Sequence, residues 1–160
     1  MLLVHNPAQL LVLRTELEEL VCKQVLREIP ADSALEEPNA RISPFFVVPK
    51  PHQPGKWRGV ADYRRWANEN FLAPHFKMES HNDVLSMLQK GDYLVKIDLR
   101  DFFYHFKIAE ADRPALRVCL NGQVYEPQVH TMGPNFSPGN TTRLFQPLVR
   151  IIRCAGIWIV

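Results

Sequence analysis

The hydrophobic residues in the first part of the chain recur with helical spacing. Between residues 8 and 28, apolar side chains return every three or four positions with glutamates among them, which predicts one amphipathic helix. Pro7 suits its first turn and Pro30 lies just past its end. Residues 30–41 are polar and predict a connector. The apolar positions of the helix are Leu10, Leu11, Leu13, Leu17, Leu20, Val21 and Val25.

Short apolar runs between turn residues predict two hairpins. FFVV at 45–48 is closed by prolines, and the Pro54-Gly55 pair that follows is a turn signal. The first half of WRGVADYRRW would then pair back onto FFVV. The second hairpin, in VCLNGQVYEP, has its turn at Asn121-Gly122 and is the strongest local signal in the sequence.

The remaining segments alternate between loops, helices and apolar runs. Residues 68–76 and 131–140 predict loops, and Val84, Leu85 and Leu88 predict a short helix capped by Ser80 or Asn82. A second helix is predicted over 141–155, where Pro147 would kink it or mark its start. Strands are predicted at YLVKIDL (93–99) and from residue 156, with a bend into a new element after residue 101. This order of helices and hairpins predicts an α+β fold.

Asp98 is unusual because it stands inside the apolar run YLVKIDL. A buried, unpaired carboxylate costs several kcal/mol. Either Asp98 lies at the end of its strand, where a cation or another partner compensates the charge, or the segment is not a strand.

Composition narrows the class of protein. The 160 residues suffice for one domain, and a hydrophobic fraction of 46% is normal for a globular core. Three widely spaced cysteines predict neither a disulfide framework nor a zinc site and favour a reducing compartment. The apolar N-terminus is broken by Asn6 and Pro7, and no run approaches a membrane span. We expect an intracellular protein without a membrane partner, in either the cytoplasm or the nucleus.

Charge is distributed unevenly along the chain. Residues 1–40 hold three Lys/Arg and seven Asp/Glu, whereas residues 41–77 hold seven Lys/Arg and two Asp/Glu. Aromatic residues interleave with this basic segment, a pattern found on nucleic-acid or phosphate-binding surfaces. A solvated basic face with an aromatic core behind it is the alternative. The aromatic residues are Phe45, Phe46, Trp57, Tyr63 and Trp66.

Four segments, in this order, resemble the fingers and first half of the palm of reverse transcriptases of LTR and DIRS-like retrotransposons. They are ISPFFVVPKP with GKWRGVADYRRW, the run HFKMESHNDVLSMLQKGDYLVKIDLRDFFYHFKI, the hairpin about Asn121-Gly122, and MGPNFSP with the helix after it. The resemblance covers residues 14–160. It implies a partial right-hand polymerase fold, with a fingers hairpin and an incomplete antiparallel palm sheet packed on helices. Residues 1–40 would be an N-terminal helix and connector, 41–90 the fingers-like region and 91–160 the incomplete palm.

The resemblance also implies an activity and a set of site residues. Nucleotide addition in this family is phosphoryl transfer assisted by two metal ions, Mg²⁺ or Mn²⁺. Asp98 would be a catalytic carboxylate and metal ligand, with the Leu99 carbonyl beside it. Phe103 would exclude a ribose 2′-hydroxyl, although it could also be a core aromatic. The implied nucleotide-binding residues are Arg58, Lys50, Lys56, Asp101, Phe102, Phe103, Met132 and Gly133, and those supporting template and palm are Gly133, Ser137 and Pro138.

The sequence departs from the family pattern in three places. Ala67 stands where the family has Asn, with Asn68 after it, and no aromatic follows closely behind Pro138. The family's Tyr-x-Asp-Asp motif is missing, and no Asp or Glu follows Glu126. Residues 1–160 alone are therefore expected not to polymerise.

Two functions remain open. The chain could be a fragment of a reverse transcriptase that acts on template-primer and dNTP once the remaining palm and the thumb are supplied. It could instead be a non-catalytic nucleic-acid-binding remnant, or a relic, that keeps the basic hairpin.

Overall fold

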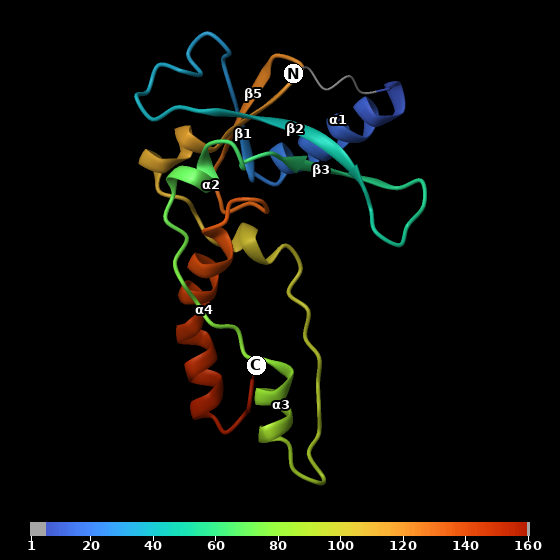
Figure 1. Cartoon of the computed structure of the whole chain (residues 1–160), viewed down its shortest axis with the longest axis vertical. Coiled ribbons are helices and arrows are strands. Elements are labelled where there is room, and N and C mark those ends of the chain that lie inside the picture. The colour runs from blue at the N-terminus through green and yellow to red at the C-terminus, as the bar shows by residue number, and fades with distance from the viewer. Residues whose placement is uncertain (1–5, 160) are drawn as a thin grey trace.

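A computed structural model describes residues 6–159. A five-stranded sheet with helix α1 (Pro7–Cys22) beside it forms one end of the molecule, and helices α3 (His81–Met87) and α4 (Ser137–Cys154) extend away from it (Figure 1). The α+β prediction is confirmed. No helix in the described part of the chain is long and apolar enough to cross a membrane.

Helix α1 begins where the sequence predicts and ends earlier. The Asn6 side chain accepts a hydrogen bond from the Gln9 backbone N–H at 2.8 Å, and the Gln9 side chain accepts one from the Asn6 N–H at 3.1 Å. This reciprocal capping satisfies two backbone donors of the first turn. The predicted extension to residue 28 is wrong: the helix stops at Cys22, and Leu26–Ile29 form strand β1. Pairing with a distant strand outweighs the local helical pattern there.

The sheet has the strand order β1-β5-β4-β2-β3. Its other strands are β2 (Ile42–Pro49), β3 (Trp57–Ala61), β4 (Arg117–Leu120) and β5 (Gln123–Pro127). The hairpins β2–β3 and β4–β5 are both antiparallel, as predicted. The β2–β4 pair is parallel, so the sheet is mixed, whereas the resemblance implied an antiparallel palm sheet.

The main core lies where α1 packs on the sheet. Leu13 and Leu17 of the helix are buried together with Val47 of β2 and Val118 of β4. Tyr63, just after β3, is also buried, and its hydroxyl donates a hydrogen bond to the Leu116 carbonyl at 3.0 Å. The partner removes the cost of burying a phenolic hydroxyl.

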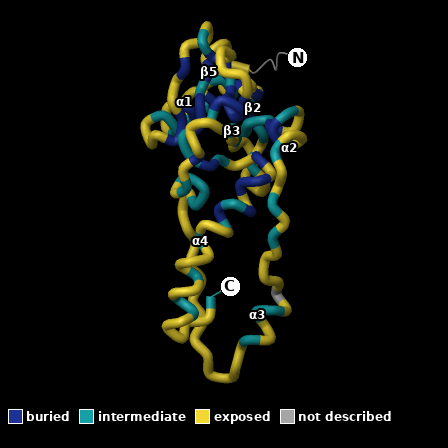
Figure 2. The backbone as a smooth tube through the Cα atoms, turned by 90° about the vertical axis from the view of Figure 1, so that its left-hand side faces the viewer, coloured by how far each residue is buried: buried dark blue, intermediate teal, exposed yellow. Residues whose placement is uncertain are grey.

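The half of the molecule away from the sheet is thinly packed, and Figure 2 shows it largely exposed. Helix α3 has the predicted cap, since the Ser80 side chain accepts from the Asp83 N–H and Asp83 accepts from the Ser80 N–H. Helix α4 begins at Ser137, inside the predicted loop 131–140, and runs through Pro147. Its buried residues are confined to the first turns. Three short helical turns complete the chain: α2 (Ala67–Asn70), η1 (Phe102–His105) and η2 (Glu110–Leu116).

Two predicted strands are absent from the described residues. YLVKIDL at 93–99 has no regular structure, and its side chains are exposed, with Tyr93 99% and Val95 83% accessible. Residues 156–159 form no strand either, and Val160 lies outside the described residues. A strand needs a neighbouring strand to form hydrogen bonds with its backbone N–H and C=O groups. Neither segment has such a neighbour in the described part of the chain.

Candidate nucleic-acid interface

The β2–β3 hairpin presents the three cations that the sequence singled out. The Lys50 N–H donates to the Lys56 carbonyl at 2.9 Å and so closes the hairpin end. Arg58 follows on β3, paired in register with Val48. Lys56 and Arg58 are exposed and Lys50 is half-buried. None of the three forms an ion pair within residues 6–159, so their charges face solvent without a carboxylate partner.

Helix α1 fixes the position of strand β3. The Gly59 N–H donates to the Glu16 carboxylate, a contact between the strand and the helix. A Cβ at Gly59 would lie 2.5 Å from Cζ of Phe45, so only glycine allows this close approach. Because Gly59 adjoins Arg58, the same contact sets where the arginine stands.

Asp62 and Arg64 pair with each other at the end of the hairpin. The guanidinium donates to both carboxylate oxygens, at 2.8 and 2.9 Å. These bonds hold the pKa of Asp62 below its ordinary value. The pair orders the turn after β3, and the Arg64 charge is matched by its neighbour.

Asp98 lies in the exposed segment 93–99, away from any strand end. The strand predicted at 93–99 is absent, so Asp98 does not lie at a strand end here, and its carboxylate is exposed to solvent. A magnesium ion takes several oxygen ligands, and no group of three or more His, Cys, Asp or Glu in the described residues could hold a metal. Asp98 and the Leu99 carbonyl by themselves do not make up such a site.

Asp101 begins the turn η1 with a left-handed backbone, at φ 55°. Its carboxylate pairs with Lys23 of the α1 terminus at 3.0 Å and lies 3.9 Å from Arg100. The Lys23 contact links the start of η1 to the end of α1, two segments far apart in the sequence.

Phe102 lies at the centre of an aromatic cluster, and Phe103 contacts this cluster through Phe102. The Phe102 ring lies 5.2 Å from Phe106 and 5.3 Å from Phe145 of α4, both edge to face. Its centroid is 5.8 Å from that of Phe103. Such pairs stabilise by about 0.5–1.5 kcal/mol each beyond burial, and here they attach η1 to α4.

Gly133 and its neighbours form a tight junction between two segments. Gly133 has φ +120°, which favours glycine, and its carbonyl accepts from the Asn68 side chain at 3.2 Å. The Asn68 side-chain oxygen in turn accepts from the Asn135 N–H at 2.8 Å. Met132 is exposed. Sequence reasoning noted Asn68 only as a departure and missed this bridging role, for which an asparagine in a polar stretch gives no specific signal.

Ser137 points inward and Pro138 outward at the start of α4. Ser137 is 1% exposed, and its hydroxyl lies 3.2 Å from Nδ1 of His130. Burial lowers the pKa of His130, which favours the neutral ring at that contact. The exposed Pro138 occupies the first helical turn, where its missing N–H costs nothing.

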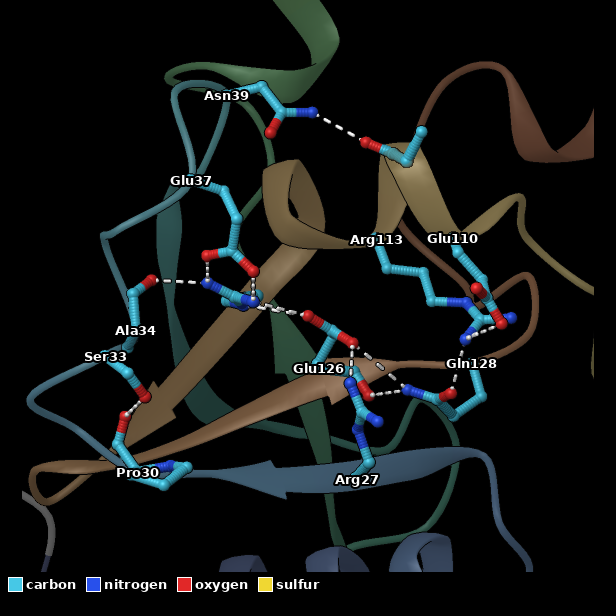
Figure 3. Close-up of polar contacts among 12 residues, drawn as sticks. Arg27, Pro30, Ser33, Ala34, Glu37, Asn39, Glu110, Arg113, Glu126 and Gln128 are labelled. Atoms are coloured by element: carbon cyan, nitrogen blue, oxygen red, sulfur yellow. Dashed lines mark hydrogen bonds and ion pairs between the residues drawn. The ribbon is translucent and has the colours of Figure 1, made fainter.

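Among the predicted site residues, Phe102 and Phe103 pack against each other, whereas the hairpin cations make no polar contact with the acidic or glycine positions in the described part of the chain. No hydrogen bond or ion pair within residues 6–159 joins the hairpin cations to Asp98, Asp101 or Gly133. The structure also reveals an ionic network that the sequence did not predict, centred on the buried pair Arg117–Glu126. Arg117 also binds Glu37, and Arg27 also binds Glu126; Figure 3 labels Glu37, Glu126 and Arg27.

No protein-family model matches the chain, and no curated protein matches it. Its structure is similar to solved structures of the prototype foamy virus protease-reverse transcriptase. The native form is 21% identical, with a TM-score of 0.72 over 92% of this chain and 18% of that chain. The fold is reverse-transcriptase-like.

Structures of the foamy viral enzyme with nucleic acid are similar as well. The dRH form in complex with double-stranded DNA is 22% identical, with a TM-score of 0.74 over 95% of this chain and 25% of that chain. The form in complex with an RNA/DNA hybrid is 20% identical, with a TM-score of 0.69 over 94% of this chain and 19% of that chain. The chain thus spans about a fifth to a quarter of the length of these reverse transcriptases.

Proposed function

We propose that this chain is the fingers and first palm portion of a retroelement reverse transcriptase, of the LTR or DIRS-like type, and that its β2–β3 hairpin binds template-primer. One observation carries the proposal: Lys50, Lys56 and Arg58 stand together on a hairpin without carboxylate partners in the described residues. The hairpin belongs to a fold shared with proteins solved in complex with double-stranded DNA and an RNA/DNA hybrid.

The chemistry of these cations suits a phosphate backbone. The arginine fork can donate two parallel hydrogen bonds to phosphate oxygens, and lysine supplies a compact charge. Each neutralised phosphate releases counterions, so affinity falls as salt rises. By the resemblance, the same three cations would contact the triphosphate of a dNTP in the complete enzyme, where Asp101, Phe102, Phe103, Met132 and Gly133 are the other implied nucleotide-binding residues.

Binding is tested with a labelled RNA/DNA hybrid and fluorescence anisotropy at several salt concentrations. The variant Lys50→Glu/Lys56→Glu/Arg58→Glu should weaken binding and reduce the slope of log K against log salt by up to about 2.7, about 0.9 for each lost phosphate contact. Arg14→Glu, which reverses the charge of one exposed cation on α1, is the control and should change the salt slope less than the hairpin variant does. Equal salt slopes for the triple variant and the unchanged protein would remove the hairpin from the interface.

Nucleotide addition in the family that this chain resembles uses the two carboxylates of a Tyr-x-Asp-Asp motif. Residues 1–160 contain no Asp or Glu after Glu126. We propose that Asp98 and the Leu99 carbonyl contribute to a Mg²⁺ or Mn²⁺ site only with a further segment that bears Tyr-x-Asp-Asp. Residues 1–160 should show no primer extension. A protein that adds such a segment and a thumb should extend primers and lose this activity on Asp98→Asn. Extension by residues 1–160, or activity retained by the Asn variant, would contradict the assignment.

The exposed apolar residues around Asp98 are consistent with that requirement. Tyr93, Leu94, Val95 and Ile97 are exposed, as are Leu144, Leu148 and Ile151 on α4. We propose that the remaining palm and the thumb cover these residues. In hydrogen exchange, backbone amides of 93–99 should gain protection when that polypeptide is supplied, and unchanged exchange would contradict the proposal.

A non-catalytic nucleic-acid-binding role is the second candidate. It is supported by the same hairpin, which needs no metal to bind phosphates. Primer extension by the completed protein distinguishes the two functions: salt-dependent binding without extension favours the binding role.

A further inference from the structure

A pocket of about 740 Å³ lies where α1 ends and β1 begins. Its walls also include residues 107, 113, 128 and 129. The volume falls in the range of small-molecule sites, about 300–1,000 Å³. None of its lining residues belongs to the site proposed above.

The lining of this pocket is rich in cations. Lys23, Arg27, Lys107 and Arg113 contribute four positive charges, and Glu28 is the one carboxylate among the lining residues. Lys23, Arg27 and Arg113 each have a carboxylate partner, so Lys107 and the partly matched Arg27 are the cations left to attract an anion into the pocket. Lysine and arginine side chains bind phosphate groups through charge-assisted hydrogen bonds.

Two of these cations keep donors for a ligand. Lys107 is exposed and makes no ion pair within residues 6–159. Arg27 is 61% exposed and uses one terminal nitrogen to bind Glu126 at 2.8 Å. Glu126 is already bound by the buried Arg117 at 2.6 Å, so the charge of Arg27 is only partly matched. The remaining N–H groups of its guanidinium are left for a second partner.

The other two cations are held in place by the protein. Arg113 donates to the Gln128 side chain at 2.8 Å and to the Ile108 carbonyl at 3.1 Å, and it pairs with the Glu110 carboxylate at 3.6 Å. Figure 3 shows Arg113 and Arg27 reaching toward Gln128 and Glu126 from opposite sides. Lys23 pairs with Asp101 at 3.0 Å. Side chains fixed in this way lose less rotamer entropy when a ligand binds.

An apolar part of the wall accompanies the charges. Val21, Leu26 and Val129 contribute to the lining, and Leu26 is buried in the main core. Cationic groups beside an apolar surface suit a ligand that has a phosphate at one end and a ring at the other, because the ring removes apolar surface from water.

We propose that this pocket binds a small phosphate-bearing molecule of nucleotide size, with its phosphates on Lys107 and Arg27 and its ring on the half-buried Val21 and Val129, beside Leu26. This assignment does not depend on the proposed polymerase function. It concerns a small ligand rather than a duplex, because the site is a concave pocket of limited volume.

The test follows backbone amide chemical shifts while the 160-residue protein is titrated with ATP, inorganic triphosphate or adenosine at constant ionic strength. ATP should shift the amides of Leu26 and Val129, triphosphate should bind more weakly and adenosine weakest. Lys107→Glu should raise the ATP Kd by about tenfold or more, the loss of one charge-assisted contact. Lys90→Glu, an exposed cation outside the pocket, is the matched control and should change Kd less than about twofold.

Lys107→Gln provides a second variant that removes the charge without reversing it, and circular dichroism checks that both variants fold. The proposal is wrong if ATP does not shift Leu26 and Val129, or if both Lys107 variants bind ATP as the unchanged protein does. Displacement of ATP by a short DNA duplex would also overturn it, since the pocket would then be part of a nucleic-acid surface. Shifts confined to the β2–β3 hairpin would support the proposed function and contradict this site.

Discussion

Arg117 and Glu126 form a buried ion pair across strands β4 and β5, with a nitrogen-to-oxygen distance of 2.6 Å and side chains only 3% and 4% exposed. The guanidinium also makes two bonds of 2.8 Å to the carboxylate of Glu37 and donates to the Ala34 carbonyl (Figure 3). Arg117 therefore fastens the connector 30–41 to the sheet. All three guanidinium nitrogens of Arg117 donate hydrogen bonds, which offsets the cost of burying its charge.

Removal of Arg117 should be strongly destabilising. Arg117→Leu leaves Glu126 buried without its main partner, and we expect the free energy of unfolding to fall by about 3–5 kcal/mol. Urea denaturation followed by circular dichroism measures the change. Arg27→Leu, which removes an exposed partner of the same carboxylate, should cost no more than about 1 kcal/mol. Equal losses for the two variants would contradict a special role for the buried pair.

Acid should weaken the same network through Glu37. Its hydrogen bonds from Arg117 lower the pKa of Glu37 from 4.5 to about 2. Because the folded pKa lies below the unfolded one, this stabilisation is present above pH 4.5 and is lost as the pH falls toward 2. Glu37→Gln should show a shallower decline of unfolding free energy between those pH values than the unchanged protein. An identical decline would place the acid sensitivity elsewhere.

Gly139 should not tolerate a side chain. A Cβ there would lie 2.6 Å from Cγ of Pro74 and 3.1 Å from Cδ1 of Phe76, so the start of α4 would be forced from the segment it packs against. We expect Gly139→Ala to lower the melting temperature, with a cost of about 1–3 kcal/mol. The double variant Gly139→Ala/Pro74→Ala should recover part of the loss. A stabilising Gly139→Ala would show that helix propensity outweighs the clash.

The Tyr63 hydroxyl should contribute measurably to stability. Tyr63→Phe removes its hydrogen bond to the Leu116 carbonyl and should cost about 0.5–1.5 kcal/mol. Burial raises the pKa of Tyr63 from 10.0 to about 12. A raised folded pKa means that the stabilisation is present below pH 10 and is lost as the pH rises toward 12. The phenylalanine variant should lack this alkaline loss, which urea titrations at pH 9 and above would test.

Local signals predicted the elements that form locally. The Asn121-Gly122 turn and the Pro54-Gly55 turn each lie between strands that are neighbours in sequence, so a few residues specify each hairpin. The Ser80 cap of α3 was predictable for the same reason. Elements that depend on remote partners were not: Leu26–Ile29 is a strand because it pairs with β5, although its own spacing continues a helix.

The candidate site was harder to predict than the fold. The basic hairpin was identified from composition because charge without nearby carboxylates is visible in a sequence. A strand was predicted around Asp98 because its neighbours are apolar, yet apolar residues form a strand only where another strand pairs with them. The Arg117 network joins residues 37, 117 and 126, and no spacing rule brings such distant charges together.

While the protein is being synthesised, β2 must wait for its parallel partner β4. Residue 42 pairs with residue 117, so the β2–β3 hairpin leaves the ribosome well before the strand that completes its other edge. At about 5–20 residues per second, the wait lasts roughly 4–15 seconds. Throughout that interval the nascent chain presents an open strand edge, a site where other chains or chaperones can attach. Newly made copies of the protein are thus most vulnerable to aggregation before β4 arrives.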